Sequence, residues 1–120
     1  MSNQRRPTPA GAAAGRPAQV ITGGDPRESG LNYLMLALYP RDKAEELGRF
    51  LAENGVETAV VPSHNSSLLQ VIALPGYEGG EVEARTEFRR RMLELGRQWK
   101  AYNGGRGTDL SDMWYAKYTE

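Results

Sequence analysis

The sequence predicts an α+β fold in which an antiparallel sheet carries two helices on one face. Three observations support this prediction. An apolar strand pattern at residues 31–39 leads directly into an amphipathic helix, two further strand patterns follow as a hairpin, and a long helical stripe ends near residue 102. Packing both helices on the same face would leave the opposite face of the sheet uncovered.

Residues 31–39 are predicted to form the first strand, because apolar side chains run through them almost without a break. Side chains alternate along a strand, so its two faces differ in kind. The face expected under the helices carries Leu34, Leu36 and Leu38. The face expected to stay open carries Tyr33, Met35, Ala37 and Tyr39.

The first predicted helix begins after Pro40, which has no N–H to donate to a sheet and is well placed before a helix. Apolar residues recur at helical spacing through residues 44–51, with charged residues on the other side. Asn54-Gly55 is a typical helix stop, because glycine readily adopts the left-handed conformation found after a helix end.

Two short strands and a long helix are predicted next. Residues 56–61 and 68–74 have strand patterns, and the small polar residues between them predict a hairpin. A loop at residues 75–80 precedes a helix over about 81–102. The apolar stripe of this helix has spacings of four, three, four and three, through Phe88, Met92, Leu95, Trp99 and Tyr102.

The two ends of the chain differ in composition from its centre. Residues 1–30 are rich in Ala, Gly, Pro and Arg, with Val20-Ile21 as the only apolar pair, and predict a disordered tail or linker before a single domain at 31–120. Residues 108–120 hold several aromatic residues that we expect to pack on the domain. We favour a docked helical turn there over an edge strand.

The composition limits the classes of function. The chain has no cysteine, a formal net charge of zero and a pI of about 6.6, so we expect no Cys-based zinc site and consider nucleic-acid binding unlikely. No apolar run is long enough to cross a bilayer. We therefore expect a cytoplasmic chain with no metal, no cofactor and no catalytic residue, or a cell-envelope protein if the chain is part of a longer anchored one.

The predicted order of elements is the split βαβ, or ferredoxin-like, plan. Within it, residues 33–39 (Tyr-Leu-Met-Leu-Ala-Leu-Tyr), residues 43–47 (Lys-Ala-Glu-Glu-Leu) and the stop at Asn54-Gly55 resemble the first repeat of the SPOR, or sporulation-related, domain. Residues 69–75 (Leu-Gln-Val-Ile-Ala-Leu-Pro), with Tyr77, are similar to its second repeat. The resemblance covers about residues 31–100. It implies a βαββαβ domain of bacterial origin that binds peptidoglycan glycan strands lacking stem peptides.

Three features suggest chemistry, and each has a simpler interpretation. His64 lies among serines in the hairpin turn, but no partner carboxylate is near in sequence. The glycines before the second helix resemble a phosphate-binding loop, yet glutamates surround them. Residues 89–91 are three arginines, and Glu87 and Glu94 are spaced to pair with them along the helix. We interpret these features as a turn, a flexible loop and a solvated face.

Three functions of different classes remain after this comparison. The first is a non-catalytic SPOR-like module that binds a glycan through Tyr33, Met35, Tyr39 and Gln70 on the open sheet face. The second is a protein-interaction or homodimerisation module that uses the same face. Met35 favours it, because SPOR domains have a polar Gln at this position, whereas methionine suits apolar packing better than a sugar contact. The third is RNA binding by the strand tyrosines, although no RNP-type strand motif is present.

Overall fold

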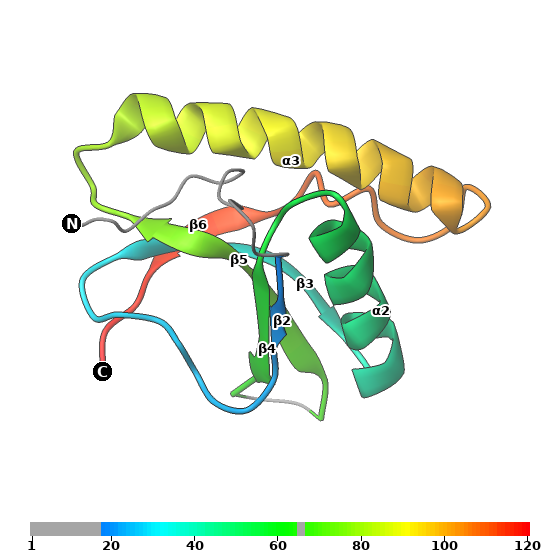
Figure 1. Cartoon of the computed structure of the whole chain (residues 1–120), viewed down its shortest axis with the longest axis horizontal. Helices are drawn as coiled ribbons and strands as arrows, with labels where there is room; N and C mark the ends of the chain where they lie inside the picture. Colours follow the sequence, from blue (N-terminus) through cyan, green and yellow to red (C-terminus); the bar gives the residue numbers. More distant parts are fainter. Residues whose placement is uncertain (1–17, 65–66) are drawn as a thin grey trace.

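The computed structural model of the chain describes residues 18–64 and 67–120, so the part of the predicted tail at residues 1–17 lies outside the described residues. Over these described residues the fold is α+β, with two helices and one five-stranded sheet (Figure 1). In chain order the elements are β2 (Val20–Ile21), β3 (Asn32–Tyr39), α2 (Arg41–Glu53), β4 (Thr58–Pro62), β5 (Leu69–Tyr77), α3 (Val82–Tyr102) and β6 (Trp114–Lys117).

The sheet has the strand order β2-β4-β5-β3-β6. The predicted β4–β5 hairpin is confirmed, and β3 pairs antiparallel with both β5 and β6. The prediction of a purely antiparallel sheet is wrong, because β2 pairs parallel with β4. The boundary of the predicted tail at residue 30 is therefore also too late, since Val20 and Ile21 already belong to the sheet.

The preference for a helical turn near the C-terminus is wrong as well. Residues 110–113 form a turn in which Met113 N–H donates to the Leu110 carbonyl oxygen at 3.1 Å, and the chain then continues as β6. A strand satisfies the backbone groups at the edge of β3, and it places Tyr115 on the helix side and Trp114 on the other side. A helical turn at this place could do neither.

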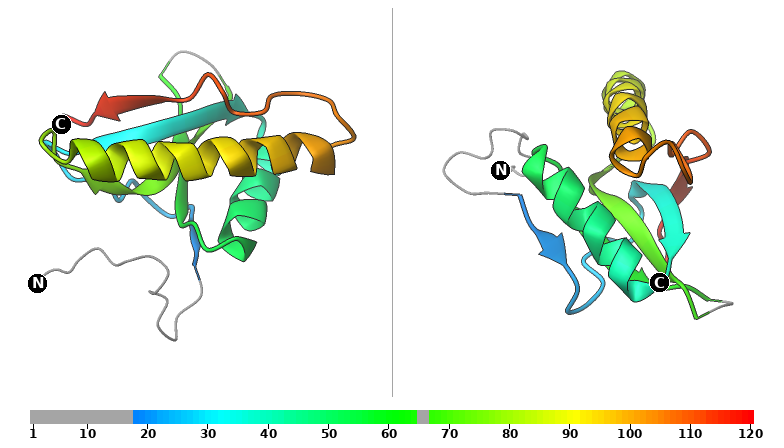
Figure 2. Two further views of the ribbon diagram at one scale, coloured as in Figure 1. Left: turned by 90° about the horizontal axis from the view of Figure 1, so that it is seen from above. Right: turned by 90° about the vertical axis from the view of Figure 1, so that its right-hand side faces the viewer.

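Both helices contribute to one core cluster, as predicted. It includes Leu47 and Leu51 of α2 and Met92, Leu95 and Trp99 of α3, packed on strand residues such as Val60 and Val71. Figure 2 shows α3 running lengthwise over the sheet and α2 crossing at an angle to it. We call the sheet face on this side the helix face, and the opposite one the helix-free face.

A register shift in β3 changes which side chains reach each face. The pairing of β3 with β5 shifts between Met35 and Ala37, so Leu36 is an extra residue in β3. Beyond this bulge the alternation is reversed. Tyr39 packs on the helix face, where Trp99 Nε1–H donates to its hydroxyl oxygen at 3.1 Å, whereas Leu38 is 48% exposed. Ala37 likewise packs on the helix-face core, so the predicted faces of Ala37, Leu38 and Tyr39 are wrong.

Candidate functional site

A loop crosses the helix-free face and decides which part of it is accessible. We call residues 22–31 the strap; they connect β2, at one side of the sheet, to β3, on the far side of β4 and β5. Figure 1 shows the strap on the side of the sheet away from α3. Leu31 at its end packs on a second core cluster that contains Tyr33, Ala59, Val61 and Ile72. Much of the predicted open face is thus covered.

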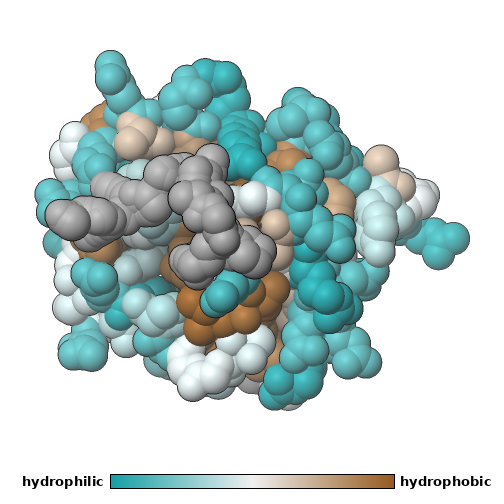
Figure 3. Space-filling view, in the orientation of Figure 1, coloured by the Kyte–Doolittle hydropathy of each residue, from teal (hydrophilic) through white to brown (hydrophobic). Residues whose placement is uncertain are grey.

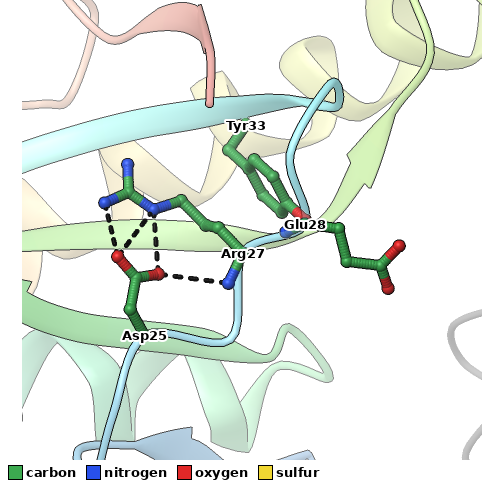
Figure 4. A network of polar contacts seen from close by, with 4 residues as sticks. All are labelled: Asp25, Arg27, Glu28 and Tyr33. Carbon is green, nitrogen blue, oxygen red and sulfur yellow. Dashed lines mark hydrogen bonds and ion pairs between the residues drawn. The ribbon is translucent and has the colours of Figure 1, made fainter. Parts of the chain in front are cut away.

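The strap is held by polar contacts around Arg27 (Figure 4). The Asp25 carboxylate accepts hydrogen bonds from the Arg27 guanidinium, with Nη2 to Oδ2 at 2.7 Å and Nε to Oδ1 at 3.0 Å. The same guanidinium lies 4.3 Å from the centroid of the Tyr118 ring, just after β6. These hydrogen bonds from Arg27 lower the pKa of Asp25. Arg27 therefore connects the strap both to Asp25, within the strap, and to Tyr118, which follows β6.

Tyr33 is the second anchor of the strap. Its hydroxyl oxygen accepts a hydrogen bond from the Glu28 backbone N–H at 2.8 Å, and its side chain is only 3% exposed. Burial raises the pKa of the Tyr33 hydroxyl. A ring that is buried and bonded in this way is a part of the core, and the structure leaves no room for a ligand to stack on it.

An apolar area remains exposed beyond the strap. Met35 on β3 pairs across the strands with Trp114 on β6, and Trp114 is 60% exposed. Leu38 follows Met35 on the same face after the bulge, and it pairs with Gln70 on β5. The Gln70 amide Nε2 donates to the carbonyl oxygen of Ala37 at 3.0 Å, which fixes this side chain to the sheet. We call Met35, Leu38, Gln70 and Trp114 the apolar end.

The four residues predicted to bind a ligand do not stay together. Met35 and Gln70 lie on the helix-free face, as expected, but Tyr33 is buried and Tyr39 lies on the helix face. The RNA alternative depended on exposed strand tyrosines, and neither of these two offers an open ring. Trp114 was absent from the predicted site, although the aromatic run after residue 112 already predicted that this segment packs on the domain.

The arginine run on α3 is engaged in structural contacts. Arg90 forms an ion pair with Glu87, Arg91 Nη2 donates to the Asn54 carbonyl oxygen at 2.5 Å, and Arg89 Nη2 lies 3.4 Å from the Met113 carbonyl oxygen. The predicted partner Glu94 instead pairs with Arg97, one turn further along. The arginines therefore tie α3 to the end of α2 and to the turn before β6.

The remaining candidates show no converging chemistry. His64 is exposed at the hairpin turn, next to the undescribed residues 65 and 66. In the glycine loop before α3, which is interpreted from the sequence as a flexible loop, the Glu78 N–H donates to Glu81 Oε2 at 2.7 Å. Over residues 18–64 and 67–120, no group of three or more His, Asp or Glu side chains is arranged to hold a metal ion, and no helix is long and apolar enough to cross a membrane.

Comparisons with known proteins add no assignment to this geometry. A scan against protein-family models gives no match, and searches of curated proteins and of solved structures find no significant similarity.

Proposed function

We propose that this chain is a non-catalytic association module that forms a homodimer through the apolar end. The observation that carries this proposal is the exposure of Trp114 and Leu38 on the same face as Met35. Apolar side chains that are exposed on one face of a sheet, rather than scattered singly, are typical of an interaction surface. Methionine and tryptophan are also enriched at the centres of protein interfaces.

For the fold we propose a ferredoxin-like plan of the SPOR type. The four longer strands have the order β4-β5-β3-β6, and α2 and α3 connect β3 to β4 and β5 to β6. This order and these connections support the proposal, because the split βαβ plan interleaves two such units in one sheet. The two-residue strand β2 and the strap would then be additions to the plan.

The net charge of the chain favours a second copy of the chain as the partner that binds the apolar end. The formal net charge is zero, so two copies do not repel each other as a whole. The apolar end has no ionisable side chain that an identical surface would have to desolvate. Four side chains cover less than the roughly 800 Å² per partner of a standard interface, so we expect a reversible dimer that forms at high concentration.

Light scattering on the full chain across a concentration series tests this proposal. We expect the mass to rise from monomer to dimer, and Leu38→Glu to abolish the rise because it would bury two unpaired carboxylates. Tyr102→Glu is the matched control, since Tyr102 is 61% exposed on α3, away from the apolar end. A monomer at every concentration, or a dimer that Leu38→Glu leaves intact, would disprove the proposal.

Glycan binding is a second candidate, and the exposed Trp114 favours it. An indole face in water is a suitable platform for a sugar ring, and Gln70 lies on the same face of the sheet. The resemblance to SPOR domains suggests peptidoglycan as the first ligand to examine. A chain that stays monomeric and sediments with insoluble peptidoglycan, but no longer does so after Trp114→Ala, would support this candidate over the dimer.

A further inference from the structure

A shallow basic groove lies between α3 and β6, on the other side of β6 from the apolar end. Its volume is about 350 Å³. Three of its lining side chains are arginines and none is acidic, and the others are mainly apolar. The lining residues are Val82, Arg85, Thr86, Arg89, Arg90, Leu93 and Tyr115.

The positive charge in this groove is poorly balanced by the protein. Among residues 18–64 and 67–120, only Arg90 of the three has a carboxylate within ion-pair distance, and that pair with Glu87 is exposed. Arg89 contacts carbonyl oxygens. The Arg85 guanidinium donates from Nη2 to the Gly79 carbonyl oxygen at 3.1 Å and lies 5.4 Å from the centroid of the Tyr115 ring, so its contacts do not neutralise its charge. An acidic ligand would supply the missing charge.

The apolar part of the groove is built around Tyr115. Its hydroxyl donates to the Arg85 carbonyl oxygen at 2.9 Å, which fixes the ring against the first turns of α3. Val82, which is 57% exposed, and the half-buried Leu93 lie further along the same groove. An aliphatic side chain that points toward α3 would therefore find an apolar contact here.

The free edge of β6 lies next to this groove. Among residues 18–64 and 67–120, β6 is the last strand of the sheet, and it pairs only with β3. Tyr118 N–H donates to the Leu31 carbonyl oxygen at 2.9 Å. Hydrogen bonds alternate along an antiparallel strand, so the N–H groups of Tyr115 and Lys117 point away from β3. An extended segment could pair with them.

We propose that the groove binds an extended acidic segment of a partner protein, which adds to β6 as a further strand and places its carboxylates against Arg85, Arg89 and Arg90. Alternate side chains of the added strand would face α3, so acidic residues at every second position fit the groove. A second copy of the chain fits less well. Pairing β6 with β6 would bring Lys117 and the arginines of both copies together.

The first test uses fluorescence anisotropy with the full chain and a labelled peptide in which Glu and Val alternate. The same peptide with Lys in place of Glu is the ligand control. We expect the Glu peptide to bind and the Lys peptide not to bind. We expect Arg90→Glu to weaken binding about tenfold, because it reverses one of the groove charges.

Arg97→Glu is a matched protein control for this experiment. Arg97 and Arg90 are similarly exposed, and each pairs with a glutamate three residues earlier on α3, but only Arg90 lines the groove. We expect Arg97→Glu to change binding less than about twofold. Equal losses for the two variants would mean that the peptide senses only the net charge of α3, and that result would overturn the proposal.

A second measurement tests strand addition separately from charge. Amide hydrogen exchange should slow at Tyr115 and Lys117 when the Glu peptide binds, since their N–H groups would become hydrogen-bonded. Lys117→Pro should weaken binding, because proline removes one outward N–H. No slowing at either amide would overturn strand addition. Tighter binding of an oligouridylate RNA than of the peptide, lost in Arg90→Glu, would overturn the acidic peptide as the ligand.

Discussion

The ring of Tyr33 lies directly against Gly76: a Cβ atom at Gly76 would come within 2.5 Å of Tyr33 Cζ. Glycine at this position of β5 therefore gives the ring the space in which it is buried. The same ring presents its hydroxyl to the Glu28 N–H of the strap. Because Gly76 has no side chain, the Tyr33 ring can be buried against β5, and its hydroxyl holds the strap across the sheet.

Replacing Gly76 with alanine should loosen the strap. The added methyl group would push the Tyr33 ring out of place and break its hydrogen bond to Glu28, so we expect a loss of about 1–3 kcal/mol in the free energy of unfolding. Urea denaturation measures this loss. Gly79→Ala is the control, because no atom lies within 4 Å of its added Cβ. Equal stabilities for the two variants would contradict the assigned packing.

The ion pair of the strap should make stability depend on acid pH. The hydrogen bonds from Arg27 lower the pKa of folded Asp25 below its ordinary value of 3.8. The pair therefore stabilises the fold fully above that value, and the contribution is lost as the pH falls through the lower pKa of the folded state. Because the pair is partly exposed, we expect at most about 1 kcal/mol.

Comparing Asp25→Asn with the parent chain isolates this contribution, since all other carboxylates are common to both. Thermal unfolding should show the parent chain to be the more stable at about pH 7 and the two to converge near about pH 2. A difference in stability that stays constant over this range would mean that the Asp25 charge does not stabilise the strap.

Gly96 in α3 should not tolerate alanine. A Cβ atom there would lie 2.0 Å from the Asp109 carbonyl oxygen, which belongs to the segment before β6. In an exposed helix interior the same change would stabilise by roughly 0.5–1 kcal/mol. We expect a loss of about 1–3 kcal/mol instead, because α3 and this segment would have to move apart. Chemical denaturation decides between a gain and a loss.

Tyr39→Phe should be destabilising although it removes only one oxygen atom. The Tyr39 hydroxyl is the acceptor for Nε1–H of Trp99, which is fully buried. Leaving that N–H without a partner costs about 1–3 kcal/mol. Tyr102→Phe, at an exposed position near the end of α3, should change the free energy of unfolding by less than about 0.5 kcal/mol. Denaturation followed by tryptophan fluorescence measures both variants.

The helices and the hairpin could be predicted from the sequence, because the patterns that indicate them lie within each element or directly beside it. Pro40 and Asn54-Gly55 bracket α2, and the apolar stripe of α3 extends over most of its length. The strand Val20–Ile21 could not be predicted, since two residues have no period and depend on a partner, β4, that is distant in sequence. The choice between strand and turn at residues 114–117 likewise depended on the free edge of β3.

The candidate site was predicted less well, in part because β3 contains a bulge. The rule that side chains alternate along a strand fails at a bulge, and the extra residue Leu36 reverses the faces of Ala37, Leu38 and Tyr39. Met35 and Gln70 keep their predicted face. Trp114 could be added only after β6 was known to pair with β3. Figure 3 shows that hydrophobic surface also lies at β2, which the sequence analysis had assigned to the tail.

The two edges of the sheet are unequal, and this limits how copies of the chain could assemble. At one edge, β2 pairs with only two residues of β4, and β4 ends at Pro62, which has no N–H to offer. The β6 edge is the more regular one. An incoming strand can therefore pair with the β6 edge, whereas the β2 edge offers little backbone for pairing. Copies of the chain would therefore not join the β6 edge of one to the β2 edge of the next, which is the contact that an open-ended fibril needs.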